Sequence, residues 1–214
     1  ADVAGVVDPA YVELIRQAAQ GKVLHNDDTS MKILALMKET NANKPETDSA
    51  DKRERTGVFT SGIVSIDDGH KIALFFTGHQ HAGENLADVL ARRASELGPP
   101  IQMCDALSRN VPKGFEVLLG NCTAHGRRKF VDVFANFPGE CRYVLETLRD
   151  VYKNDAVAEE QGMSAQERLT FHRLHSGPLM EELEKWLKDQ IAEKKTEANS
   201  GLGKAISYMK NHWK

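Results

Sequence analysis

The spacing of apolar residues changes along the chain, and this change limits the folds that the chain can adopt. Two runs in the first half, VFTSGIVSI and HKIALFFTG, are rich in β-branched and aromatic residues and are separated by Asp67, Asp68 and Gly69. An Asp-Gly step between apolar runs is a strong signal for a β-hairpin. From His125 onward, apolar residues instead recur at the three- and four-residue intervals of amphipathic helices. Strands followed by helices predict an α/β or α+β fold around one mixed sheet.

The other elements of the first half are predicted from the same patterns. Pro9 suits the first turn of a helix over residues 9–20, and a second helix is expected over 84–97. Further strands or extended segments are expected at residues 22–26, 30–37, 101–107 and 115–119. Residues 38–56 contain almost no large apolar side chain, so they cannot bury enough surface to become ordered, and a long mobile loop is expected there.

The second half predicts a series of helices. Apolar stripes cover residues 130–137 and 141–152, and a last stripe runs from Leu202 to Trp213. Ser164 followed three residues later by Glu167 is a capping box that begins a third helix, and Gly177 with Pro178 begins a fourth. His70, His79 and His81 are interpreted as loop residues.

Composition excludes several classes of protein. Of the 214 residues, 41% are hydrophobic and 28% are charged, which is typical of a globular protein with one sizeable core. No apolar run approaches the roughly 20 residues of a membrane span, and no secretory signal is expected at the start. Cys104, Cys122 and Cys141 form no CxxC pair, which argues against a structural zinc site and favours a reducing cytoplasm. The net charge of −3 leaves nucleic-acid binding open, because phosphate contacts need only a local basic face.

Two aspartates are candidates for metal chemistry. Asp27 and Asp105 each follow a short apolar strand, and neighbouring strands of one sheet could bring them together. Magnesium prefers hard oxygen ligands and typically takes one or two carboxylates together with water and substrate phosphate. The spacing alone also fits a simpler interpretation, since an aspartate at a strand end commonly serves a turn or a helix cap.

Several segments follow one another in the same order as in a known family of proteins. The segments HNDDT and GNCTAHGRRKF resemble, respectively, the "ADET" segment and the "CWAHxRRKF" signature of the IS66 family of transposases. GENLADVL followed by IQMCD resembles the family's approach to its second aspartate. The tail also fits, with MSAQERLTFHRLHSGPLMEELEKWL and GLGKAISYMKNHW matching two helical segments of the family. The resemblance covers residue 22 to the end of the chain.

The resemblance implies a ribonuclease-H-like catalytic core over residues 1–137, with the long loop at 38–56, followed by a mainly helical insertion over 138–214. It implies that Asp27 and Asp105 are catalytic and bind Mg²⁺ or Mn²⁺. The implied reaction is metal-dependent cleavage and strand transfer at transposon ends. The implied partners are DNA and other copies of the full-length protein, in a bacterial cytoplasm without membrane attachment.

Departures from the family pattern lie close to the implied site. Asp28 occupies the position of the family's glutamate in "ADET", so it is interpreted as a neighbour of the ligand. After Asp105 this chain has ALSRN in place of a run with glycine and tyrosine, and Thr123 replaces the signature tryptophan. The family's third carboxylate is a glutamate in a later segment that matches nothing before Lys214, so these residues alone are expected to be inactive.

The signature also carries a cluster of basic residues with two interpretations. His125, Arg127, Arg128 and Lys129 could contact DNA phosphates, or could form the solvated face of an ordinary helix. A nucleophile–base pair of Cys122 and His125 is a further alternative, although the sequence offers no orienting third group. Two other functions stay open: a non-catalytic DNA-binding or assembly fragment, and a ribonuclease-H-like nuclease unrelated to transposition.

Overall fold

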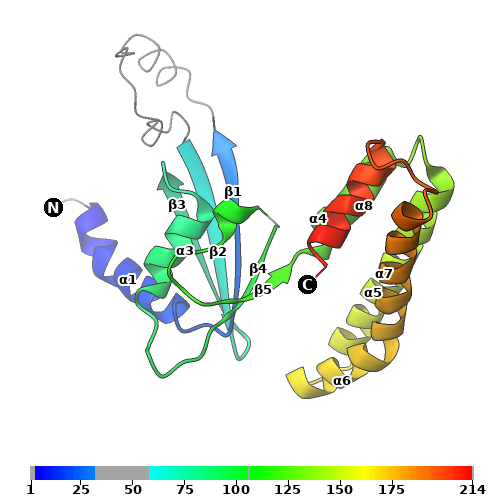
Figure 1. Ribbon diagram of the computed structural model, residues 1–214. Coiled ribbons are helices and arrows are strands. Elements are labelled where there is room, and N and C mark those ends of the chain that lie inside the picture. The colour runs from blue at the N-terminus through cyan, green and yellow to red at the C-terminus, as the bar shows by residue number, and fades with distance from the viewer. Residues whose placement is uncertain (1–2, 32–57, 106, 214) are drawn as a thin grey trace, which may run out of the picture. The chain divides into compact units, whose positions relative to one another are not determined.

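The computed structural model describes residues 3–31, 58–105 and 107–213 (Figure 1). The long loop expected at 38–56 and most of the extended segment expected at 30–37 lie outside these residues. The chain divides into two compact units, a sheet unit, Ala1–Asn121, and a helical unit, Cys122–Lys214. The division comes before the boundary that the sequence suggested at residue 137. The helix in between, α4 (Thr123–Val133), packs against other helices of the helical unit, which accounts for the earlier division.

The described residues of the sheet unit form one mixed sheet of five strands. They are β1 (Val23–Met31), β2 (Val58–Asp67), β3 (His70–Gly78), β4 (Ile101–Cys104) and β5 (Leu118–Asn121). Their order is β3-β2-β1-β4-β5, with β1, β2 and β3 pairing antiparallel and β4 pairing parallel to both β1 and β5. The predicted α/β class with one mixed sheet is therefore confirmed, and this order and these directions are those of a ribonuclease-H-like core.

The hairpin between β2 and β3 forms where the sequence predicted it. Asp67 pairs with His70, which leaves Asp68 and Gly69 as a two-residue loop. Both loop residues have positive φ, 43° and 84°, as the tight primed hairpin turns require. The loop therefore fixes the register of β2 against β3.

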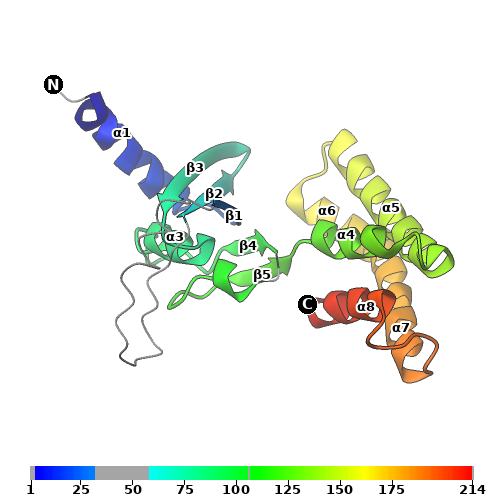
Figure 2. The same ribbon diagram turned by 90° about the horizontal axis from the view of Figure 1, so that it is seen from above.

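One face of the sheet is covered by helices. Leu24, Ile63 and Leu74 are buried on it, and they share a core with residues of α1 (Val3–Ala18) and α3 (Ala82–Leu90). The side chains that alternate with them point to the other face, where Phe75 is 69% exposed. A short 3₁₀ helix, η1 (Ser108–Asn110), follows β4. Figure 2, in which the molecule is seen from above, shows α3 beside the sheet.

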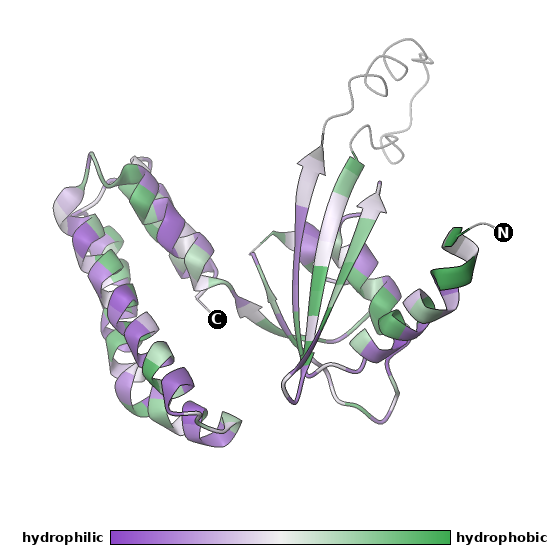
Figure 3. Cartoon of the chain, turned by 180° about the vertical axis from the view of Figure 1, so that it is seen from behind, coloured by the Kyte–Doolittle hydropathy of each residue, from purple (hydrophilic) through white to green (hydrophobic). Residues whose placement is uncertain are grey.

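The helical unit is built from five helices around its own core. These are α4, α5 (Pro138–Glu160), α6 (Ala165–His175), α7 (Gly177–Ala192) and α8 (Gly201–Asn211). Phe130, Leu148, Leu187 and Ile206 are among the fully buried residues. Polar and apolar residues alternate around these helices, as in amphipathic helices (Figure 3). Among the described residues, no helix is long and apolar enough to cross a membrane.

Several element boundaries differ from the sequence predictions. Helix α1 begins six residues before Pro9, so the prediction that Pro9 lies in its first turn is wrong. Proline there removes one helical hydrogen bond, and this end of the helix is exposed, so water can satisfy the carbonyl that loses its donor. Helix α3 ends at Leu90, well before the predicted 97, and β5 begins at Leu118, three residues after the predicted 115. The capping box at Ser164 is confirmed, since its hydroxyl accepts from the Glu167 N–H.

Candidate active site

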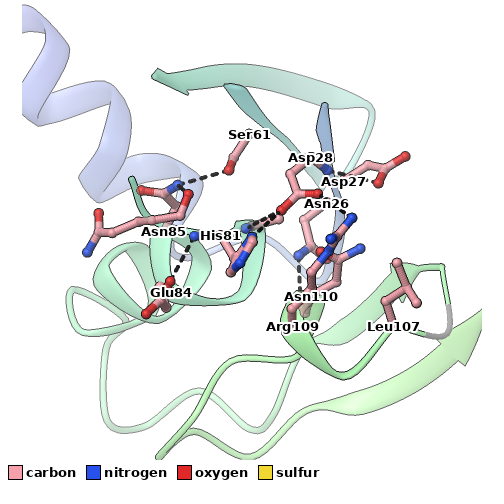
Figure 4. Close-up of polar contacts among 12 residues, drawn as sticks. Asn26, Asp27, Asp28, Ser61, His81, Glu84, Asn85, Leu107, Arg109 and Asn110 are labelled. Carbon is pink, nitrogen blue, oxygen red and sulfur yellow. Dashed lines mark hydrogen bonds and ion pairs between the residues drawn. The ribbon is translucent and has the colours of Figure 1, made fainter. Parts of the chain in front are cut away.

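The paired aspartates of β1 point to opposite faces of the sheet. Side chains alternate along a strand, so Asp28 shares the helix-covered face with the buried Asn26, while Asp27 is exposed on the other side. The close-up in Figure 4 shows Asp28 directed toward His81 and Asp27 directed away from it. Two neighbouring carboxylates therefore meet different surroundings.

Asp28 is enclosed by donors from three other groups. Its Oδ2 lies 3.0 Å from Nδ1 of His81 and 3.4 Å from the Ala82 N–H, and its Oδ1 lies 3.2 Å from Nη2 of Arg109. The Asp28 side chain is 0% exposed. A buried carboxylate is costly unless it is paired, and here the imidazole, the guanidinium and the positive end of the α3 dipole compensate it. Oδ2 of Asp28 is thus held by two protein groups, whereas Oδ1 lies within ion-pair distance of Arg109 and accepts no hydrogen bond from the described residues.

His81 is held in place at the start of α3. It is the N-cap residue of that helix, and its backbone N–H donates to Oε2 of Glu84 at 2.8 Å. Its ring also packs against Phe59, with the ring centroids 4.2 Å apart. The sequence interpretation of His81 as a loop residue missed this role, because the pairing with Asp28 spans 53 positions.

Asp105 lies just after β4 and is held by the turn that follows it. Its Oδ1 accepts from the Leu107 N–H at 3.1 Å and from the side-chain amide of Asn110. No described residue donates to its Oδ2. Asp27 has the same asymmetry, since its Oδ1 accepts from the Asp28 N–H at 2.8 Å while its Oδ2 meets no donor in the described chain.

Asp27 lies in β1, and Asp105 directly follows β4, the parallel neighbour of β1. In the register of β1 on β4, Leu24 lies opposite Gln102 and His25 opposite Met103. Asp27 and Asp105 each lie two residues beyond the last of these pairs, at the same edge of the sheet, and neighbouring strands lie about 4.8 Å apart.

The carboxylate oxygens of Asp27 and Asp105 are the candidate ligands for a divalent ion. The described residues contain no group of three or more His, Cys, Asp or Glu side chains that could hold a metal. Asp27 and Asp105 each keep one carboxylate oxygen without a donor from the described residues, and magnesium commonly takes only one or two carboxylates, with water and phosphate completing its shell. These two oxygens suit a hard divalent ion, whereas the carboxylate of Asp28 is buried against His81, Ala82 and Arg109.

The basic cluster of the signature lies on α4 in the helical unit. Arg127 and Arg128 are exposed and form no ion pair within the described chain, while Nζ of Lys129 lies 5.3 Å from the ring centroid of Tyr208. His125 is half-buried, and its backbone N–H donates to the Cys122 carbonyl at 3.1 Å. Within the described chain, Cys122 and His125 are thus joined through backbone atoms, and no third group orients a Cys–His pair.

Three buried amide side chains next to Asp105 were not predicted from the sequence. The Asn26 side chain is 4% exposed and those of Gln102 and Asn110 are fully buried. Asn26 and Gln102 interrupt the apolar pattern on the covered face of β1 and β4, and this interruption was the sequence signal for a buried polar network. A buried amide needs hydrogen-bond partners, so its presence at a core position indicates a polar network.

Comparisons with known proteins address the family directly. The family model described as Transposase IS66 family matches residues 1–214, the whole chain. The uncharacterized protein y4jD of Sinorhizobium fredii (strain NBRC 101917 / NGR234) is 38% identical over 97 residues, which are 44% of this chain. The match spans only 18% of the length of that relative. No solved structure matches. Because the family model covers the chain from end to end and the sheet has a ribonuclease-H-like order, the chain belongs to the IS66 family of transposases.

Proposed function

We propose that Asp27 and Asp105 are metal-binding carboxylates of a transposase that cuts and rejoins DNA at transposon ends. The observation that carries this proposal is the contrast among three aspartates. Asp27 in β1 and Asp105 directly after β4 each keep one oxygen without a donor from the described residues, whereas the side chain of Asp28 is fully buried against His81, Ala82 and Arg109. The neighbour role assigned to Asp28 from the sequence agrees with its burial.

The chain's own groups would act mainly by positioning. The free oxygens of Asp27 and Asp105 would hold Mg²⁺ or Mn²⁺, which in phosphoryl transfer stabilises the charge that develops on the attacking and leaving oxygens. Each carboxylate is fixed through its other oxygen, so its free oxygen has a defined direction. Such preorganisation, rather than covalent participation, is the usual contribution of a protein to phosphoryl transfer.

The metal proposal is tested by Mn²⁺ titration, followed by the paramagnetic signal of the free ion. We expect Asp27→Asn and Asp105→Asn each to weaken binding at least tenfold. Asp132→Asn on α4 removes an equal charge from an exposed position and should leave the affinity unchanged. Unchanged affinity in both site variants would refute the metal site.

Cleavage of supercoiled DNA gives a second test. The family resemblance implies a glutamate as a third ligand, and two carboxylates alone leave the ions short of protein oxygens. We therefore expect weak cleavage by these 214 residues and stronger cleavage by a polypeptide that includes that glutamate. Metal-dependent cleavage that survives both Asp→Asn changes would place the chemistry on other residues.

We also propose that the basic cluster on α4 contacts DNA phosphates. Arg127 and Arg128 support this, since both are exposed and form no ion pair within the described ranges. Each phosphate contact contributes about 0.9 to the slope of log affinity against log salt concentration. Replacing both arginines by alanine should lower that slope by about 2. Replacing Lys185 and Lys188, which pair with acidic residues one turn away, should change it little.

A further inference from the structure

The turn after β4 ties the ends of two strands together. Within η1, Arg109 pairs with Asp28 of β1, and the side-chain amide of Asn110 donates to Oδ1 of Asp105. The Asn110 carbonyl also accepts from Nδ2 of Asn26 and from Nε2 of Gln102, each at 2.7 Å. Asn110 is therefore the point at which β1, β4 and Asp105 meet.

The orientation of each amide in this network follows from its partners. Nε2 of Gln102 faces the Asn26 Oδ1, at 2.7 Å, and the Asn110 carbonyl, and both can only accept. Nδ2 of Asn110 faces the carboxylate of Asp105, which also accepts when ionised. Reversing either amide would bring two acceptors together, so the direction of the donors is determined.

Asn110 has features of a group that orients a neighbour. It is 0% exposed, and the two amides that hold its carbonyl come from β1 and β4, so its backbone is fixed by the sheet. Both donors to Asp105, the Leu107 N–H and the Asn110 amide, reach the same oxygen. The other oxygen, Oδ2, is left without a donor from any residue that the structure describes.

We infer that Asn110 is a positioning residue for Asp105: it fixes Oδ1 and so directs Oδ2 toward the divalent ion. This inference rests on the proposed function, because it assumes that Asp105 is a metal ligand. It also gives a role to the ALSRN segment, where this sequence departs from the family pattern. Outer-shell partners of metal ligands typically change affinity about 10–100-fold when they are removed.

The first test is the Mn²⁺ affinity of Asn110→Leu. Leucine has nearly the shape of asparagine but no donor, so the variant keeps the packing and the backbone carbonyl while releasing Asp105. We expect about tenfold weaker binding. Ser108→Ala, in the same turn and at an exposed position, is the matched control and should bind as the wild type does. A purely structural role would lower the unfolding midpoint of Asn110→Leu without changing the Mn²⁺ affinity of the folded protein, and that result would overturn the inference.

A double-mutant cycle separates this inference from the proposed function. If Asp105→Asn leaves the Mn²⁺ affinity unchanged, the proposed metal site is wrong. If Asp105→Asn weakens binding but Asn110→Leu does not, only the positioning role is wrong. If Asn110 acts through Asp105, Asn110→Leu should have no further effect in the Asp105→Asn background, and an additive effect there would contradict the inference.

A measurement on the unmodified protein covers the case in which Asn110→Leu does not fold. In ¹H–¹⁵N spectra, the side-chain amide of Asn110 should shift as Mg²⁺ is added, because its acceptor becomes a metal ligand. The side-chain amide of Gln80, which donates to Asp88 at 3.0 Å, should not shift. An Asn110 signal that stays constant up to saturating Mg²⁺ would overturn the inference.

Discussion

Gly83 allows α3 to lie directly against the turn that holds Asp105, and Gly83→Ala tests this contact. It is the second residue of α3, and an added Cβ would lie 2.5 Å from the Val111 carbonyl oxygen and 2.6 Å from that of Arg109. Ordinary contacts begin at 3.4 Å, so backbone would have to move by nearly 1 Å. Overpacking of this kind costs about 1–3 kcal/mol, and alanine recovers up to about 1 kcal/mol of helix propensity. We expect a net loss of about 2 kcal/mol, since the clash is with backbone rather than a flexible side chain.

Gly139→Ala is the matched control for this prediction. Gly139 is also the second residue of its helix, α5, but a Cβ there would meet nothing within 4 Å. Alanine should therefore stabilise the helical unit by about 0.4–1 kcal/mol. Both changes are measured by urea unfolding at one temperature, followed by far-UV circular dichroism.

Tryptophan fluorescence locates the effect, because Trp186 and Trp213 are the only tryptophans and both lie in the helical unit. Gly83→Ala should lower the midpoint of the circular dichroism transition that belongs to the sheet unit and leave the fluorescence midpoint in place. A Gly83→Ala protein as stable as the Gly139→Ala protein would refute the close packing of α3 on η1.

Three further predictions concern single side chains. Asp28→Ala leaves the Arg109 guanidinium without its buried counter-charge and Nδ1 of His81 without its partner, and it should destabilise the sheet unit by about 3 kcal/mol in urea unfolding; a loss below about 1 kcal/mol would contradict the pairing. The hydrogen bond from the Arg168 guanidinium on α6 holds the pKa of Asp155 below its usual range. The stability that this hydrogen bond contributes is therefore present near neutral pH and is lost as the pH falls through the lowered pKa. Asp155 is half-exposed, so Asp155→Asn should cost under about 1 kcal/mol at pH 6, and the cost should shrink as the pH falls through the lowered pKa. Burial raises the pKa of the Cys141 thiol, so Cys122, which is partly exposed, should react first with a thiol reagent in the folded protein.

The elements that follow from local patterns could be predicted well from the sequence. The hairpin at Asp68 and Gly69 is determined by two adjacent residues and the apolar runs beside them. The capping box at Ser164 is likewise local, since its two partners are three residues apart. Boundaries set by tertiary contacts were less accessible. The end of α3 at Leu90 and the assignment of α4 to the helical unit both depend on packing partners far away in the sequence.

The polar network of the candidate site could be predicted only in part. The positions of Asp27 and Asp105 came from strand ends and from the family resemblance. The roles of Arg109 and Asn110 depend on an ion pair with Asp28 and a hydrogen bond from Asn26, each of which spans about eighty residues. The sequence shows that Asn26 is an amide at a core position, but it does not show which groups form hydrogen bonds with that amide. Only the register of β1 on β4 supplies the partners.

That register also decides which of two adjacent carboxylates is free. A slip of β1 by one residue would turn Asp27 toward α3 and Asp28 toward the open face, because side chains alternate along a strand. Leu24 prevents the slip, since it is fully buried in the core with Ile63, and the slip would expose it. The pairing of β1 with β2 holds the same register along nine residues, and the two-residue loop after Asp67 sets where β3 joins them. The availability of Asp27 thus depends on the apolar core and on the pairing of β1 with β2 as much as on the residue itself.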